Sequence, residues 1–373
     1  MQVEWSIVLP PPIRRANRSL TARLFSTQTQ ISTQGEKGLL AIACSPNFIV
    51  DRTPYLHMNP STANTTDILQ YRTLTTDLQR ADTSTANTIL VVQQPAGAGF
   101  LNHKRGMLAF GALGRLLIGL GDGGSGGDPL NNPRSRNVLL GKLLRVEVGS
   151  DAFPADPDRD YAILVDNPFV GGGGSPEIWA LGLRNALVGS VDTVAGDVLI
   201  GDVGQAAIEE INRIPASSTG PLNYGWNRRE GSQPYLGGAD DPSFLLLVTE
   251  YPHGPGPFSG NSVTGGILYR GPIEVLQGLY IFGDFRPAPN VWSVPAASLT
   301  PDAILPTNSL TNRNTAFTPD VGQFTCLVNF GTNTDGSLYL VEFCTGQIFA
   351  VEPNPLSPLR PRPAMTDNRH RGS

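Results

Sequence analysis

Residues 196–205 read GDVLIGDVGQ, and this short pattern decides the fold. A glycine opens the pattern, three or four apolar residues follow, and a small or acidic turn closes it. The same unit recurs as GRLLIGLGDGG from Gly114, GLYIFGDFR from Gly278 and GSLYLVEFCTG from Gly336. The first three units start 82 residues apart, and the fourth starts 58 residues later. Recurring strand units with inserts of unequal length predict an all-β propeller, in which loops from several blades converge on one face.

The composition supports many short strands and tight turns. Gly 42 and Pro 32 make up about a fifth of the 373 residues, and only 16% are charged. This excludes a helical bundle, because exposed helices need charged faces. The clearest helical candidate is short, at about residues 133–140. We expect one propeller domain over residues 22–352, an irregular segment at 1–21 and a disordered Pro- and Arg-rich tail at 353–373.

Charge and hydropathy exclude two classes of protein. The net charge is −5 without a basic run, which argues against nucleic-acid binding. No apolar run approaches the roughly 18 residues that a membrane span needs. The N-terminal MQVEWSIVLPPP lacks a preceding basic region, so no signal peptide is visible. A bridge between Cys326 and Cys344 is possible, but the spacing of the three cysteines does not decide it.

His103 is the first candidate for catalysis. A neutral imidazole is the usual group for taking a proton near pH 7. Asp122 follows nineteen residues later, at the end of the next strand, where its carboxylate could orient the ring. The alternative is a polar loop histidine. The glycines between 119 and 127 match several phosphate and nucleophile patterns, but prolines follow where a helix would have to begin. They predict a turn that allows close backbone approach.

Arg184 and Asn185 end an apolar strand in IWALGLRN. A buried arginine there needs an anion, which could belong to a ligand or to an internal salt bridge. The acidic run at 156–160 lacks the glycine and the bidentate glutamate of a calcium loop, and it predicts a surface loop. His253, in YPHGPGP, could line a pocket or cap a turn.

Read together, the ordered segments resemble the glucose/sorbosone dehydrogenase family, which includes sugar dehydrogenases dependent on pyrroloquinoline quinone (PQQ) and hedgehog-interacting-protein-like members. The resemblance runs from about residue 25 to 350 and implies a six-bladed β-propeller with an incomplete or altered first blade. The segments that carry it include GEKGLLAIACSPNF (35–48), NHKRGMLAFG (102–111), LIGLGDGGSGGDP (117–129), PEIWALGLRN (176–185), GDVLIGDVGQAAIEEINRI (196–214), NYGWNRREG (223–231) and LYIFGDF (279–285).

The resemblance implies catalytic roles for His103, Asp122 and Arg184. The family's histidine takes the proton of the anomeric hydroxyl of an aldose while hydride moves from C1 of the sugar to C5 of the quinone. The acid orients this histidine, and the arginine contacts the quinone. The product is a lactone, and an external acceptor takes the electrons.

The resemblance also implies a cofactor site that holds PQQ and Ca²⁺. The calcium ion polarises the C5 carbonyl as a Lewis acid, and it is bound mainly by backbone carbonyls at Gly204 and Gln205. The positions implied around the quinone are Glu36, Arg184, Asn185, Tyr251 and Arg286. By the same resemblance we expect an extracytoplasmic protein that is a monomer or a homodimer.

Several positions depart from the family pattern. Lys104-Arg105 stands near the histidine where the family usually has Gly-Gly, and Gln323 and Thr325 stand where an arginine pair is expected. Two alternatives therefore stay open. One is a non-catalytic binding propeller of the hedgehog-interacting type, and the other is a calcium-dependent lactonase-type hydrolase, which would need an acidic cage at the centre.

Overall fold

The computed structural model describes residues 31–353 except 79, 238–240, 287, 302 and 320–321. The predictions for residues 1–21 and 354–373 therefore lie outside the described residues. Helices in the described part are short: α1 (Phe48–Asp51) and the 3₁₀ turns η1 (Ala98–Phe100), η2 (Ala112–Gly114), η3 (Glu274–Leu276), η4 (Ala296–Ser298) and η5 (Thr307–Ser309). The helix predicted at 133–140 is wrong. Its backbone groups bond to other segments instead, as when Gly182 N–H donates to the Pro133 carbonyl.

Five sheets follow one another along the described chain, and they are the blades of the propeller. Blade 1 contains β1 (Leu39–Cys44), β2 (Pro54–Met58), β3 (Thr65–Thr73) and β4 (Ala81–Gln93). Blade 2 contains β5 (Leu108–Phe110), β6 (Leu116–Leu120), β7 (Lys142–Val146), β8 (Ile178–Leu181) and β12 (Leu222–Asn223). Blade 3 contains β9 (Ala186–Val191), β10 (Val198–Asp202), β11 (Ile208–Ile214) and β15 (Thr249–Pro252).

Blades 4 and 5 complete the described series. Blade 4 contains β16 (Val263–Leu268), β17 (Leu279–Asp284), β18 (Val291–Pro295) and β19 (Thr311–Asn312). Blade 5 contains β20 (Leu327–Thr332), β21 (Leu338–Glu342) and β22 (Ile348–Ala350). A short hairpin of β13 (Arg229–Glu230) and β14 (Gln233–Pro234) lies outside these sheets. All pairings within the blades are antiparallel except the parallel contact of β12 with β8.

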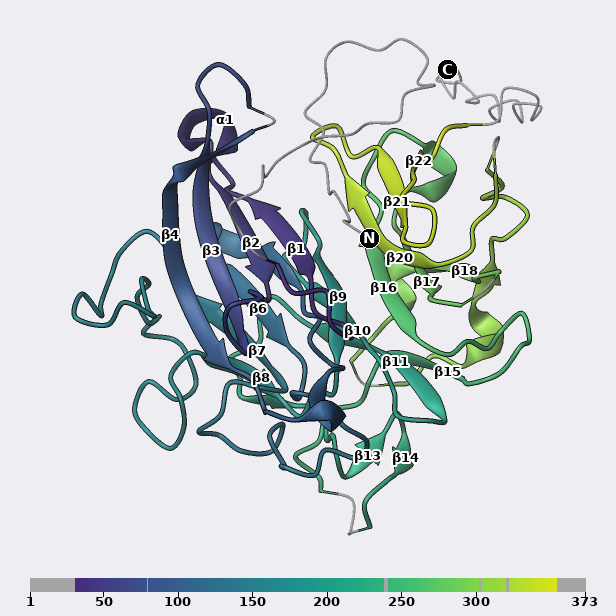
Figure 1. Ribbon diagram of the computed structural model, residues 1–373. Coiled ribbons are helices and arrows are strands. Elements are labelled where there is room, and N and C mark those ends of the chain that lie inside the picture. Colours follow the sequence, from purple (N-terminus) through teal and green to yellow (C-terminus); the bar gives the residue numbers. More distant parts are fainter. Residues whose placement is uncertain are drawn as a thin grey trace, which may run out of the picture.

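The blades stand side by side in chain order, from the purple first sheet to the yellow-green fifth (Figure 1). Their inner strands β1, β5, β9, β16 and β20 each contact the next in the series. The all-β propeller is therefore confirmed. The described residues contain five blades, so the sixth is not confirmed there. Blade 1 has four strands, so the incomplete blade that we expected is not this one.

The hydrophobic core is divided into layers between neighbouring blades. One cluster joins blades 1 and 2 through side chains such as Ile68 and Leu144, and another joins blades 2 and 3 through Trp179 and Ile200. Two further clusters join blades 3 and 4, and blades 4 and 5. Because both faces of each inner blade are covered, strands such as β10 are buried throughout. This explains the continuous apolar runs in the sequence.

The recurring glycine unit has a structural cause. The four units contain β6, β10, β17 and β21, which lie in four different blades as predicted. The opening glycines are all left-handed, with φ of +74° at Gly114, +81° at Gly196, +72° at Gly278 and +82° at Gly336. A side chain would strain this conformation, so glycine is favoured at the turn that leads into the second strand of these four blades.

The acidic residue that closes the unit fastens three of the blades. Six residues after the opening glycine, three units carry Asp202, Asp284 and Glu342. The Asp202 carboxylate accepts the N–H groups of Arg184 and Asn185, just before the inner strand β9. Asp284 and Glu342 bind the corresponding amides before β16 and β20. The acid therefore acts as a backbone clamp that holds the chain entering the inner strand.

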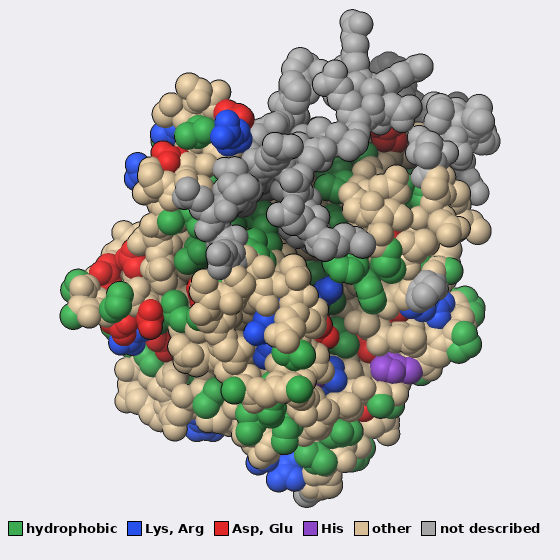
Figure 2. Space-filling model, viewed as in Figure 1, with side chains coloured by type: hydrophobic (Ala, Val, Ile, Leu, Met, Phe, Trp, Pro, Cys, Tyr) green, Lys and Arg blue, Asp and Glu red, His purple; other side chains and the backbone are tan. Residues whose placement is uncertain are grey.

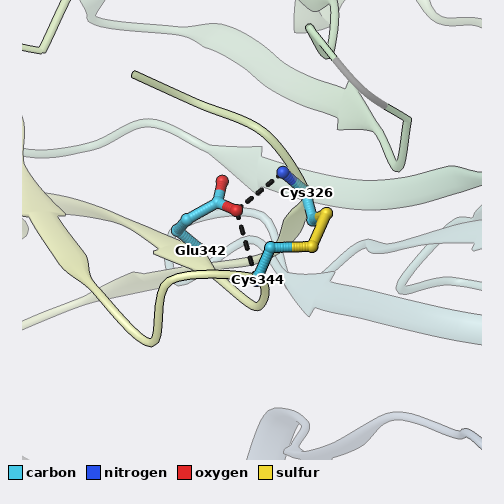
Figure 3. A group of neighbouring side chains, drawn as sticks. All are labelled: Cys326, Glu342 and Cys344. Atoms are coloured by element: carbon cyan, nitrogen blue, oxygen red, sulfur yellow. Dashed lines mark hydrogen bonds between the residues drawn. A yellow bond between two sulfur atoms is a disulfide. The ribbon is translucent and has the colours of Figure 1, made fainter. Parts of the chain in front are cut away.

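In blade 5 the clamp lies beside a disulfide bond between Cys326 and Cys344 (Figure 3). The Glu342 carboxylate accepts the N–H groups of Cys326, at 2.6 Å, and Cys344, at 3.3 Å. The bridge closes the hairpin of β20 and β21 across the clamp. The spacing of the cysteines did not decide whether Cys326 and Cys344 pair, and in the structure they form this disulfide bond.

The described residues contain no helix that could cross a membrane. On the face seen in Figure 2, basic and acidic side chains are interspersed with apolar ones.

Candidate active site

The site begins where two segments of blade 2 approach each other closely. A side chain at Gly121 would place Cβ 2.3 Å from the His103 carbonyl oxygen, and one at Gly124 would lie 2.7 Å from that of Asn102. Only glycine allows this approach. His103 itself has a φ of +53°, a conformation that is costly for a residue with a side chain and that concentrates at functional sites.

This approach brings His103 onto Asp122. Nδ1 of the imidazole lies 2.6 Å from Oδ1 of the carboxylate, and both side chains are buried. A carboxylate only accepts, so Nδ1 donates this hydrogen bond, and in the neutral imidazole the lone pair is on Nε2. Nε2 has no hydrogen-bond partner among the described residues and is not one of the fully buried unpaired atoms. The geometry therefore presents a base with its lone pair free.

Asp122 departs from the clamp of the other blades. In blade 2 the clamp position is Leu120, and the acid comes two residues later. There it accepts Gly124 N–H at 2.8 Å and Trp226 Nε1–H at 3.0 Å, in addition to the imidazole. The carboxylate that fastens backbone elsewhere is here shifted to hold a histidine side chain.

Arg184 and Asn185 lie against the same turn, because Asp122 N–H donates to the Arg184 carbonyl at 2.7 Å. The Arg184 guanidinium donates to the Val203 carbonyl at 2.8 Å and to Gln205 Oε1 at 3.2 Å. It forms no ion pair with a described carboxylate, so the internal salt bridge is not found. Arg184 Nε and Asn185 Oδ1 are buried without a partner.

Trp226 contacts both Asp122 and Arg184. Its indole N–H binds Asp122, and the Arg184 guanidinium lies 5.5 Å from the centre of its ring. Tyr235 packs on the other part of the ring, with the centroids 4.9 Å apart. Sequence reasoning did not single out Trp226. The only signal for it was its place in the NYGWN motif.

Two more of the predicted residues reach this network. The Glu36 carboxylate accepts His103 N–H at 2.7 Å. Gln205 Oε1 accepts Gly127 N–H at 2.9 Å as well as Arg184, which fixes the turn that contains the Gly204 and Gln205 carbonyls. Six predicted residues are thus connected through direct contacts: Glu36, His103, Asp122, Arg184, Asn185 and Gln205.

Tyr251 is a correction. We expected it on the rim of the pocket, but it is fully buried in the core between blades 3 and 4. Its ring lies 4.7 Å from that of Trp292, and its hydroxyl donates to the clamp carboxylate of Asp284. The alternation of β15 turns Tyr251 inward, so it cannot border a ligand.

Arg286 lies apart from the histidine pair. It is half-buried at the end of β17 and donates to the carbonyls of Gly254 and Gly256. Its Nε is buried and has no partner among the described residues. His253 forms a separate pair with Glu209, at 2.7 Å, and this hydrogen bond raises the pKa of the imidazole.

A buried cation lies next to the histidine. Lys104 Nζ donates to Gln94 Oε1 and to the Gly123 carbonyl, and burial lowers its pKa to about 8. Beneath the Asp122 turn, burial also raises the pKa of Asp128 to about 7 and lowers that of Lys142 to about 7. Titratable groups perturbed by burial are typical of functional sites.

The described residues contain one group of three potential metal ligands, Cys326, Glu342 and Cys344. It is not a metal site, because the sulfurs are bonded to each other and the carboxylate is occupied by backbone donors (Figure 3).

The protein is thus a β-propeller in which a buried histidine–carboxylate pair and a buried arginine belong to one network of contacts. Residues 13–243 match the family described as Glucose / Sorbosone dehydrogenase. The chain belongs to this family, which confirms the resemblance in the sequence.

The solved structures share the fold. A PQQ-bound aldose sugar dehydrogenase from Streptomyces coelicolor matches with a TM-score of 0.61 and 21% identity, over 85% of this chain and 77% of that one. The apo aldose sugar dehydrogenase of Escherichia coli matches with a TM-score of 0.60 and 21% identity, over 85% and 82%.

Curated relatives carry other names. The HIPL1 protein of Arabidopsis thaliana is 34% identical over 206 residues, which are 50% of this chain and 29% of that protein. The human Hedgehog-interacting protein is 27% identical over 271 residues, 69% of this chain and 34% of that protein. The chain therefore spans about a third of the length of these relatives.

Proposed function

We propose that this chain is a quinone-dependent aldose dehydrogenase, which oxidises the anomeric C1 hydroxyl of a sugar to a lactone and passes the electrons to an external acceptor. The observation that carries the proposal is the buried pair of His103 and Asp122, whose free Nε2 belongs to the same network as Arg184. The family and the PQQ-bound structural neighbour support it.

The side chains suit an anionic cofactor. Arg184 Nε and Arg286 Nε are buried N–H donors without partners, and such donors match the carboxylates of PQQ. Arg184, Asn185 and Arg286 would hold the quinone, and the carbonyls of Gly204 and Gln205 would hold Ca²⁺, for which oxygen ligands are the rule. Bound PQQ would supply the two-electron acceptor for the reaction.

The chain's own residues handle the proton. His103 Nε2 accepts the proton of the sugar hydroxyl, and Asp122 stabilises the imidazolium that forms, because the two groups already share a short hydrogen bond. Gly124 N–H and Trp226 Nε1–H keep the carboxylate in place. The fixed Nδ1 proton leaves only Nε2 available as the base.

The test is reconstitution of the protein with PQQ and Ca²⁺, followed by aldose-driven dye reduction. His103→Gln should keep quinone absorbance and lose turnover by about 10²–10⁴-fold, the usual effect of removing a general base. His253→Gln is the comparison variant, since His253 also pairs with a carboxylate but makes no contact with His103 or Asp122. Equal loss of turnover in both variants, or full activity in His103→Gln, would show that His103 is not the general base.

A second candidate is a binding propeller without catalysis. The relatives named for hedgehog interaction support it, and so does Thr325, which stands where an arginine is expected and whose hydroxyl binds the Glu342 clamp. A folded protein that shows no quinone binding at micromolar concentration would favour this candidate. The lactonase-type alternative is not favoured, because the described residues show no acidic cage for a metal.

The cellular location and the blade count belong to the proposal as well. The disulfide between Cys326 and Cys344 supports an oxidising, extracytoplasmic compartment. The family resemblance supports a sixth blade.

A further inference from the structure

Arg105 reaches across the middle of the propeller. It belongs to the segment before β5 in blade 2, yet its guanidinium carbon lies 5.9 Å from the centre of the Phe285 ring and 5.8 Å from that of Phe343. Phe285 follows β17 of blade 4, and Phe343 follows β21 of blade 5. Blade 2 adjoins neither of them, so the side chain must cross the central space between the inner strands.

The Arg105 guanidinium has no hydrogen-bond acceptor and no ion-pair partner among the described residues. Burial lowers the pKa of the Arg105 guanidinium, while the nearby Glu36 carboxylate favours its charged form, and one oxygen of that carboxylate is taken by His103 N–H. Other arginines near the site are engaged, as Arg184 is by Val203 and Arg286 is by Gly254. Arg105 alone in this group offers all five N–H donors.

The surroundings define the chemistry of a ligand. A planar guanidinium with free donors binds a carboxylate through two parallel hydrogen bonds. The rings of Phe285 and Phe343 add apolar surface beside it, with their centroids 6.2 Å apart. A planar aromatic ligand with carboxylate groups meets both demands.

We propose that Arg105 is a carboxylate anchor for a planar aromatic polycarboxylate at the propeller centre. The inference rests on the proposed function, in which PQQ is that ligand. It assigns to Arg105 a cationic role at a site where Gln323 and Thr325 replace the expected arginine pair. Thr325 cannot take this role, because its hydroxyl donates to Glu342 at 2.7 Å.

The experiment titrates apo-protein with PQQ at fixed Ca²⁺ and measures Kd by quenching of protein fluorescence. Arg105→Met should weaken PQQ binding roughly 10- to 100-fold, the usual effect of losing a bidentate charged contact. The Kd of Arg105→Lys should lie between those of wild type and Arg105→Met, since lysine keeps the positive charge but lacks the two parallel N–H donors of a guanidinium. The trimethyl ester of PQQ should bind wild type and Arg105→Met equally, because it has no free carboxylate.

Arg115→Met is the matched control, because Arg115 lies at the other end of the β5–β6 hairpin and pairs with Asp166. It should bind PQQ like wild type. A thermal melt of each variant establishes that it is folded. Equal PQQ binding in wild type and Arg105→Met would overturn the proposal. Tighter binding in Arg105→Met would also overturn it, since the arginine would then be filling the site.

A second ligand separates this inference from the proposed function. Trimesate, a planar aromatic tricarboxylate without redox chemistry, is titrated into the same proteins. If PQQ does not bind but trimesate binds in an Arg105-dependent manner, the anchor stands and the dehydrogenase proposal fails. If PQQ binds independently of Arg105, the anchor fails and the dehydrogenase proposal survives. If neither ligand depends on Arg105, the anchor fails.

Discussion

At the scale of single residues, Trp226 helps to hold the carboxylate that binds His103. Its N–H is one of the two donors that hold the Asp122 carboxylate besides the imidazole. Trp226→Phe keeps an aromatic ring beneath Arg184 and removes only the donor. We expect kcat to fall about 10-fold, since one hydrogen bond to a charged group is lost, with the quinone Kd within about twofold of wild type.

The low-field NMR signal of the His103 Nδ1 proton gives an independent measurement. In Trp226→Phe it should move upfield as the contact with Asp122 loosens. Trp179→Phe is the control, because Trp179 packs under Arg145 in the core between blades 2 and 3. An unchanged signal together with an unchanged kcat would contradict a positioning role for Trp226.

His253 gives a prediction on pH. The hydrogen bond that His253 donates to the Glu209 carboxylate raises the pKa of His253 above its usual value. The folded protein therefore binds this proton more tightly than the unfolded chain. The stabilisation is present below the unfolded pKa of about 6.5 and is lost as the pH rises through the higher folded pKa.

His253→Gln should remove this dependence. We expect the variant to be less stable than wild type by about 1 kcal/mol at pH 5.5, a value discounted for partial exposure, and nearly equal to it at pH 9. Urea unfolding at both values measures the difference. A constant difference across the range would show that the imidazole charge contributes nothing.

The sequence predicted the histidine pair because both members lie in one blade, at the ends of adjacent strands. The antiparallel pairing of β5 and β6 brings such ends together. Trp226 lies 104 residues beyond Asp122, and no local pattern connects them. Tyr251 was misplaced because the resemblance implied only its position in the chain, which does not reveal the face of β15 that the side chain occupies.

At the scale of elements, the repeated unit contains more than a strand. Three blades use the sixth position for a clamp, and blade 2 moves its acid two residues further to His103. This shift is visible in the sequence as GLGD in place of GD or VE. Departure from the repeat therefore distinguishes blade 2, which contains the proposed base, and it could have been found from the alignment of the four units alone.

The disulfide should fasten blade 5. It joins residues separated by 18 positions, and closing a loop of this length removes about 3 kcal/mol of chain entropy from the unfolded state. Cys326→Ser with Cys344→Ser should lower the melting temperature by several degrees, as measured by differential scanning fluorimetry. Cys44→Ser, which changes the free cysteine, should have little effect. Equal melting temperatures with and without reductant in wild type would contradict the prediction.

At the scale of the whole molecule, the site is assembled from several blades. Glu36 precedes blade 1, His103 and Asp122 belong to blade 2, and Arg184 lies between blades 2 and 3. The sequence predicted a propeller because each unit carries its own local signal. It could not give the number of blades, because inserts of unequal length separate the units and the pairing partners of edge strands lie far along the chain.

A ligand that binds such a site should stabilise the entire ring of blades. Binding to the folded state alone stabilises it by about 2.7 kcal/mol at a ligand concentration of 100 times Kd. For a domain of this size the melting temperature should rise by about 5 °C when PQQ and Ca²⁺ are both present. EDTA should abolish most of the shift, because Ca²⁺ offsets part of the negative charge that the quinone brings.

The melting temperature of Arg184→Met should rise less than that of wild type at the same ligand concentrations, since this variant lacks the guanidinium with the unpaired Nε. A melting temperature that rises with Ca²⁺ alone and does not respond to PQQ would mean that the metal has a structural role, and it would favour the binding propeller over the dehydrogenase.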